Sequence, residues 1–313
     1  MVKKIFGSRW VRIGFSLVLI YFAFRKVDIV DLIKQLVGVN PLFVVLNVLV
    51  AILTSGLVAY RWSLLLIKKP GFKDVWLFIK SAWAASFYGM FLPTAAAGDV
   101  LKWIIIDEKY PEIPKTKLLG SIVMDRGIGL SMFVFTGNLM LLLARVKGVT
   151  IPWPIELLFW GLFVGCIVFY VSLALGWLPK IWQIKWLKKF ESVSDLIKKE
   201  NTSQVFRCLS VSFVSELVWI LQMWLICWYF GTGLSVMSIF IFLPVISMIL
   251  ALPISFAGFG AREQLFLFFF GSMAKSPESL LLSSAFFGIL GIINSLIGGL
   301  VTLTPDFKKS LKK

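Results

Sequence analysis

The chain contains 313 residues, of which 59% are hydrophobic and 15% are charged, and its mean hydropathy is +0.90. Soluble domains carry about 25% charged residues, so this composition excludes an ordinary soluble protein and indicates a membrane protein. The net charge of +16 comes from basic residues at the ends of apolar segments, which is typical of topology determinants and of contacts with anionic lipids, and not of nucleic-acid binding. Histidine is absent and the three cysteines lie apart in apolar runs, so we expect no metal site, disulfide framework or cofactor.

The first half of the chain predicts three membrane-crossing helices and one helical hairpin. The N-terminal apolar segment lacks a small-residue cleavage site, so we expect it to be retained as the first helix. The stretch FLPTAAAGDVLK, in which Pro93 and Gly98 lie, breaks an apolar segment into two arms that are each short for a crossing. Such a break is typical of a re-entrant hairpin. The predicted elements are crossings at 10–24, 41–67 and 118–145, an amphipathic stretch at 29–36, and a hairpin at about 74–107.

The second half repeats this plan. Its hairpin is broken at PISFAGFGARE, which contains Pro253, Gly258 and Gly260. Both breaks begin with Leu-Pro followed by a glycine at the same spacing, and each is third among the four apolar elements of its half, which indicates an internal repeat. The predicted elements are crossings at 155–177, 205–230 and 279–303, a basic amphipathic stretch at 182–197, and a hairpin at about 236–271.

The distribution of basic residues predicts the topology. With the N-terminus in the cytoplasm, most Lys and Arg residues of the loops and the C-terminal tail also lie on the cytoplasmic side. The first hairpin then opens to the cytoplasm and the second to the exterior. We therefore predict an all-α multi-pass protein of the cell membrane, with inverted repeats at 1–150 and 151–313, six crossings, two re-entrant hairpins and no separate soluble domain. Paired broken helices in inverted repeats are typical of transporters that bind substrate near the bilayer midplane.

Six ionisable residues are predicted at membrane depth, where such groups usually face a cavity or a partner. Arg126 and Arg262 could each hold a phosphate with two hydrogen bonds, and Lys102 would act as a point charge. The acids would orient these cations or select a zwitterionic headgroup. The candidate substrate-binding residues are Asp99, Lys102, Asp125, Arg126, Arg262 and Glu263.

A purely structural interpretation stands beside this one. Asp99 could cap the restarting helix, and Arg262 with Glu263 could form an ion pair that holds the repeats together. Glu216 lies in an apolar run without an identifiable partner and is a weaker candidate. Arg61 is expected to snorkel to the membrane interface. No Gly-x-Ser-x-Gly, P-loop or Cys-x-x-Cys motif appears, so we expect no enzyme activity.

The chain resembles the flippase-like membrane domain of lysylphosphatidylglycerol synthases over nearly its whole length. That family typically has LPG-x-x-GE-x-x-R in the first hairpin, ER-x-x-D in the next helix and GG-x-G-x-RE in the second hairpin. This chain has LP at 92–93, GD at 98–99, DR at 125–126 and AGFGARE at 257–263. It departs by Asp at 99 and 125, by Lys102, by Ala257 in place of a glycine, and by Gly129 in place of the family's acid. The resemblance does not extend to the soluble aminoacyl-transfer domain of the full synthases, so it implies no synthase activity.

The repeats and the resemblance together predict a lipid flippase. It would move a phospholipid or lipid-linked sugar with an anionic or zwitterionic headgroup between leaflets, through a polar cavity between the hairpins. One alternative is a non-transporting partner that binds a lipid substrate for a separate glycosyltransferase. A second alternative is a membrane-embedded transferase that uses the same carboxylates as bases.

Overall fold

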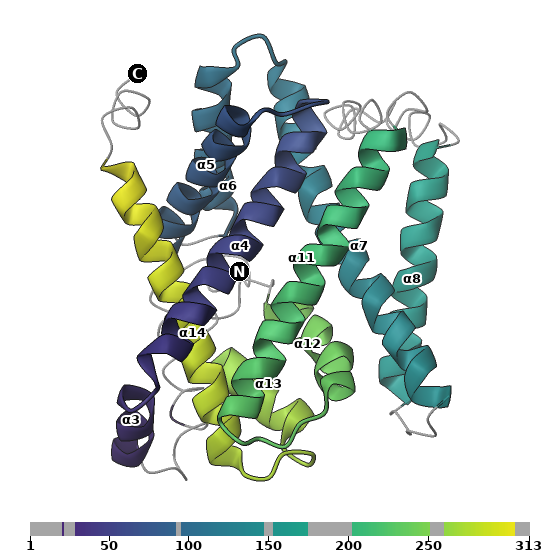
Figure 1. Cartoon of the computed structure of the whole chain (residues 1–313). Helices are drawn as coiled ribbons and strands as arrows, with labels where there is room; N and C mark the ends of the chain where they lie inside the picture. The colour runs from purple at the N-terminus through teal and green to yellow at the C-terminus, as the bar shows by residue number, and fades with distance from the viewer. Residues whose placement is uncertain are drawn as a thin grey trace, which may run out of the picture.

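The computed structural model describes residue 21 and the ranges 29–91, 95–146, 153–174, 202–250 and 260–303. Over these residues the chain is helical and has no strand, as predicted for an all-α protein. Its helices are α3 (Ile29–Val37), α4 (Pro41–Leu66), α5 (Phe72–Phe91), α6 (Ala95–Lys109), α7 (Lys115–Val146), α8 (Trp153–Ala174), α11 (Thr202–Tyr229), α12 (Val236–Leu250), α13 (Ala261–Phe270) and α14 (Pro277–Thr302) (Figure 1).

Five of these helices, α4, α7, α8, α11 and α14, are long and apolar enough to cross a membrane. They confirm the five predicted crossings that lie within the described residues, and α3 confirms the amphipathic stretch at 29–36. The predicted crossing at 10–24 and the amphipathic stretch at 182–197 lie outside the described ranges. Local sequence explains where two of the helices begin: Asn40 and Ser276 accept hydrogen bonds from backbone N–H groups of the first turn, and a proline follows each.

The outer surface of the bundle is apolar and its interior contains many polar groups. Along α4, Leu42, Val45, Leu49 and Leu53 are about half exposed or more. Asn47, on the same helix, is fully buried and lies beside Gln222 of α11. This inverted arrangement suits a protein whose outer solvent is lipid, and it confirms a multi-pass membrane protein.

At the positions of the two predicted hairpins the structure has two packed helix pairs, α5 with α6 and α12 with α13. Figure 1 shows the first pair at the upper end of the bundle and the second pair at the lower end. Residues 92–94 and 251–259 lie outside the described residues, and with them Pro93, Pro253 and Gly258. The remainder of the first predicted break, from Ala95 to Lys102, is helical and belongs to α6. The described bounds therefore confirm one helix before and one helix after each predicted break.

Two of the hairpin glycines are described, and each has a steric reason. A Cβ atom at Gly98 would lie 2.9 Å from the backbone oxygen of Ala85, so glycine allows α6 to approach α5 closely. Gly260 precedes α13 with a φ of 77°, in the left-handed region that a side chain disfavours.

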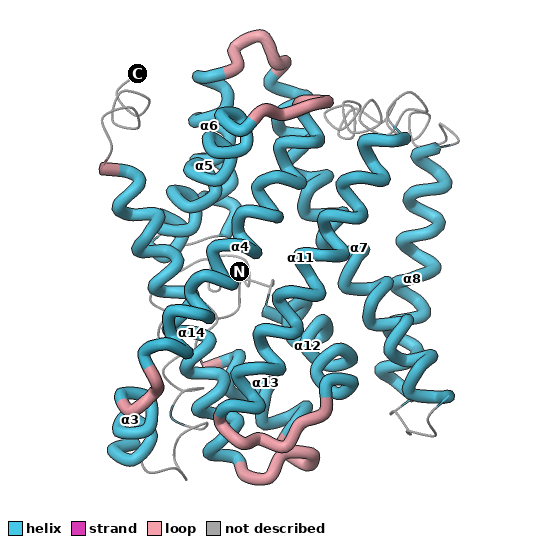
Figure 2. The backbone as a smooth tube through the Cα atoms, viewed as in Figure 1, coloured by secondary structure: helices cyan, strands magenta, loops and turns pink. Residues whose placement is uncertain are grey.

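The packing of the helices places α4 against α11 at the centre of the molecule. The first hairpin helix, α5, packs against α14, and α12 packs against α7. Each hairpin thus packs against a long helix from the other half of the chain. Figure 2 shows that the loops joining α4 to α5 and α6 to α7 lie at one end of the bundle, and those next to α12 and α13 lie at the other.

Candidate functional site

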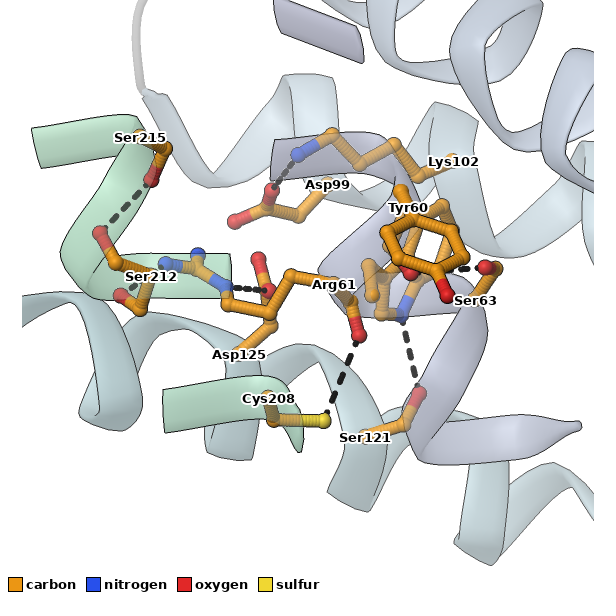
Figure 3. A network of polar contacts seen from close by, with 11 residues as sticks. Tyr60, Arg61, Ser63, Asp99, Lys102, Ser121, Asp125, Cys208, Ser212 and Ser215 are labelled. Carbon is orange, nitrogen blue, oxygen red and sulfur yellow. Dashed lines mark hydrogen bonds and ion pairs between the residues drawn. The ribbon is translucent and has the colours of Figure 1, made fainter. Parts of the chain in front are cut away.

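Arg61 lies inside the bundle, at the meeting point of α4, α7 and α11 (Figure 3). Its Nε atom donates to Oδ1 of Asp125 at 2.7 Å, and Nη1 donates to the hydroxyl of Ser212 at 2.8 Å. Only 6% of the residue is exposed, so the expectation that Arg61 snorkels to the interface is wrong. The physical reason is that α7 and α11 supply acceptors for the guanidinium inside the protein.

A second set of charges lies next to this pair. Asp99 on α6 forms ion pairs with Arg126 on α7 and with Lys102, whose Nζ atom is 3.4 Å from Oδ1 of Asp99. Lys102 also lies over the ring of Trp62, with its Nζ atom 5.8 Å from the ring centroid. The side chain of Arg126 is half exposed, whereas that of Asp99 is largely buried. Asp99 lies in the second turn of α6, and its carboxylate binds Lys102 and Arg126. Its position therefore fits the interpretation in which Asp99 orients these cations better than the one in which it caps the helix.

Arg61 lines a cavity of about 220 Å³ between α4, α7 and α11. Arg61 and Glu216 both line it, as do Gly129 and Ser215. Nε and Nη1 of Arg61 have protein partners, but Nη2 has none among the described residues. One Glu216 oxygen accepts from Thr136, and the other likewise lacks a partner within the described ranges. A cationic residue and an acidic residue therefore line the same cavity.

Because residue 129 is a glycine, no side chain there separates the guanidinium of Arg61 from the cavity. A Cβ atom at Gly129 would lie 3.3 Å from Nη1 of Arg61, so any longer side chain here would occupy the space beside the guanidinium. The departure from the resembled motif at this position thus has a direct consequence for the cavity.

Arg262 and Glu263 form a separate cluster at the start of α13. Nη2 of Arg262 is 2.9 Å from Oε1 of Glu263, and Ser284 on α14 bonds both residues. The second Glu263 oxygen accepts the backbone N–H of Gly260 at 2.6 Å, so the start of α13 is capped by its own glutamate. Both charged side chains are nearly fully buried. This cluster fits the structural interpretation, although it joins α13 to α14 within the second half.

The structure therefore divides the predicted site into two. Asp99, Lys102, Asp125 and Arg126 lie together and gain Arg61 as a fifth member. Arg61 had no distinguishing signal in the sequence, because an arginine near the end of an apolar helix has the same pattern whether it snorkels or pairs internally. With three basic groups and two carboxylates, the first cluster can offer guanidinium and ammonium donors to an anion such as phosphate.

A family model described as the lysylphosphatidylglycerol synthase TM region matches residues 9–298. The chain belongs to this family. The matched range includes both helix pairs and both charged clusters. Among curated proteins and among solved structures, no significant match was found. Family membership and the five apolar helices make this a membrane protein related to lipid metabolism or lipid handling.

Proposed function

We propose that the chain is a lipid flippase, which moves a lipid with a phosphate-bearing headgroup between the two leaflets of the cell membrane. The observation that carries the proposal is the cavity at Arg61, where a buried guanidinium retains an unused donor inside a bundle whose outer surface is apolar. A buried cation with a free donor group is costly unless it serves a ligand or water. The headgroup would enter this cavity while the acyl chains stay in the surrounding lipid.

The packing of the helices supports an internal inverted repeat. If α4, α5, α6 and α7 are exchanged with α11, α12, α13 and α14, the set of packed pairs among these helices is unchanged: α5 on α14 corresponds to α12 on α7, and α4 on α7 corresponds to α11 on α14. The hairpins lie at opposite ends of the bundle, as inverted repeats require (Figure 1). Repeats of this kind allow one half to move against the other around a central site.

The position of the cavity supports a site near the bilayer midplane. Thr54 and Glu216 line it, and each lies close to the middle residue of its own long helix. Basic residues at 68, 69, 115 and 117 lie at the end of the bundle where the first hairpin opens, which supports a cytoplasmic location for that end.

The test is transport by the purified protein in liposomes that contain a panel of headgroup-labelled lipids. We expect at least one phosphate-bearing lipid to cross faster than in empty vesicles. Asp99→Asn should slow that crossing, because it frees Arg126 and Lys102 from the carboxylate that orients them. Glu112→Gln, an exposed acid in the loop before α7, is the matched control and should leave the rate unchanged.

Failure of every lipid to cross would contradict the flippase. If Asp99→Asn nevertheless abolished the cellular function in that case, the result would support a binding partner that presents lipid to a separate glycosyltransferase. Hydrolysis or transfer on the lipid during the assay would instead support a membrane-embedded transferase.

A further inference from the structure

A second cavity, of about 300 Å³, lies on the other side of the contact between α4 and α11. It is formed by α4, α5, α11 and α14, and it shares Thr54, Val58 and Trp219 with the cavity at Arg61. The two cavities therefore adjoin through these three side chains, so one ligand could occupy both.

The lining of the second cavity is mostly apolar and carries a few uncharged polar groups. Among the described residues that line it, none is ionisable. It has hydroxyls from Ser55 and Ser86 and amides from Gln222 and Asn294, beside the aromatic rings of Trp83 and Trp219. Aromatic faces together with a few amide and hydroxyl groups suit a ligand that has both C–H faces and hydroxyls.

Two polar atoms of this lining lack a hydrogen-bond partner among the described residues. They are the indole Nε1 of Trp83, which is a donor, and the amide Oδ1 of Asn294, which is an acceptor. The amide nitrogen of Asn294 is held by Ser55 at 3.1 Å, and Ser86 is paired with Ser295 at 2.7 Å. A hydroxyl group can accept from Nε1 of Trp83 or donate to Oδ1 of Asn294, whereas an acyl chain can do neither.

We propose that this cavity binds a neutral sugar ring of the lipid headgroup, so that the preferred substrate is a lipid-linked sugar phosphate. The proposal rests on the proposed lipid transport and names its substrate class. Ser55 and Arg61 are six residues apart on α4, a rise of about 9 Å, which is a suitable distance between a sugar ring and a phosphate at the guanidinium. The uncharged lining excludes a second ionic group, and the Trp rings can cover the C–H face of the sugar.

The test is equilibrium binding to the full chain in nanodiscs, with three probes: glucosyl polyprenyl phosphate, polyprenyl phosphate without sugar, and phosphatidylglycerol. We expect the glucosyl lipid to bind about tenfold more tightly than the unglycosylated phosphate. Asn294→Leu should remove this preference and leave the affinity for the unglycosylated phosphate unchanged. Asn138→Leu is the matched control, since Asn138 on α7 is also buried with an unpartnered Oδ1 but lines neither cavity.

Equal binding of the glucosyl and unglycosylated lipids by the wild type would overturn the proposal, as would an unchanged preference in Asn294→Leu. A preference for phosphatidylglycerol that depends on Asn294 would assign the cavity to a glycerol group and overturn the sugar. Because Asn294→Leu could impair folding, Ser86→Cys offers an independent measurement: glucosyl lipid should protect it from a thiol reagent, and unglycosylated phosphate should not. If the glucosyl lipid binds in a way that depends on Asn294 but no lipid crosses in the liposome assay, the sugar-binding cavity stands and the flippase is refuted.

Discussion

At the scale of single residues, the same local arrangement holds two buried arginines. On α7, Asp125 accepts from Nε of Arg61, and Gly129 lies four residues later against the guanidinium. On α14, Ser284 accepts from Nε of Arg262, and Gly288 lies four residues later against that guanidinium. In each case an acceptor and a glycine one helical turn apart form a flat seat for a planar group.

The two glycines should respond differently to substitution by alanine. A Cβ atom at 288 would lie 2.2 Å from Nη2 of Arg262, so Gly288→Ala must displace a buried side chain, and we expect a loss of about 1–3 kcal/mol. A Cβ atom at 129 would lie 3.3 Å from Arg61, so Gly129→Ala should be close to neutral, helped by the higher helix propensity of alanine. Thermal unfolding in detergent measures both, and equal losses would contradict the seat at Gly288.

The buried pair of Arg61 and Asp125 gives a second prediction. Asp125→Leu leaves the guanidinium without a counter-charge, and we expect a loss of about 3 kcal/mol in the free energy of unfolding. Adding Arg61→Met should recover most of that loss, because two apolar side chains replace the whole pair. Denaturant unfolding of both single variants and the double variant gives the coupling. Additive losses would mean that the two side chains do not act as a pair.

The residue scale is where the sequence was least informative. It identified Asp99, Lys102, Asp125 and Arg126 as charges at membrane depth, and these four do lie together. It could not separate them from Arg262 and Glu263, because the bonds of both residues to Ser284 depend on the tertiary approach of α13 to α14. Arg61 was misplaced for the same reason, since its partners are 64 and 151 residues away.

At the scale of elements, a polar contact outside the five long helices joins the start of α5 to the residue after α6, at the open end of this helix pair. The hydroxyl of Tyr110, after α6, donates to Asp74 in the first turn of α5 at 2.5 Å, and the N–H of Gly71 donates to the same carboxylate. The hydrogen bond from Tyr110, followed by that from Gly71, lowers the pKa of Asp74. Burial and the neighbouring carboxylate raise the pKa of Tyr110. At neutral pH Asp74 is therefore ionised and Tyr110 is protonated, as their hydrogen bond requires.

The hydrogen bond between Tyr110 and Asp74 predicts that the thermal stability of the protein depends on pH. Because the pKa of Asp74 is lower in the folded protein, its contribution is complete above the unfolded value of about 3.9 and is lost as the pH falls through the lower folded value. Tyr110→Phe should therefore lower the melting temperature at pH 7, and the difference from wild type should shrink as the pH falls below about 4. A difference that stays constant with pH would show that the Asp74 carboxylate does not stabilise the hairpin through Tyr110.

Helix bounds were the part of the fold that the sequence predicted well. Apolar length defines a membrane helix, so the predicted 41–67 and 205–230 agree with α4 and α11 to within a few residues. The end of α5 at Phe91 and the end of α12 at Leu250 lie next to the two predicted breaks, where Leu-Pro interrupts an apolar run. The packing of α5 on α14 had no sequence signal, since it depends on shape: a Cβ atom at Gly298 would lie 2.1 Å from the backbone oxygen of Trp83.

At the scale of the whole molecule, transport requires one half to move against the other, and α5 against α14 is the contact to test. The hydroxyls of Ser86 and Ser295 meet at 2.7 Å across it, so paired cysteines there are close enough for a disulfide. In the variant with Ser86→Cys and Ser295→Cys, oxidation should stop lipid movement and reduction should restore it. Each single variant is the control, and undiminished transport by the oxidised protein would exclude relative movement of these helices.

The central claim is that the charges of Arg61 and Asp125 serve a lipid headgroup as well as the fold. The most direct measurement is lipid transport in liposomes by the double variant Arg61→Met with Asp125→Leu, at a temperature where its unfolding curve shows it to be folded. The proposed function predicts that this folded protein moves the wild-type substrate no faster than empty vesicles do. Transport at the wild-type rate would contradict it, and would make the buried pair a structural contact alone.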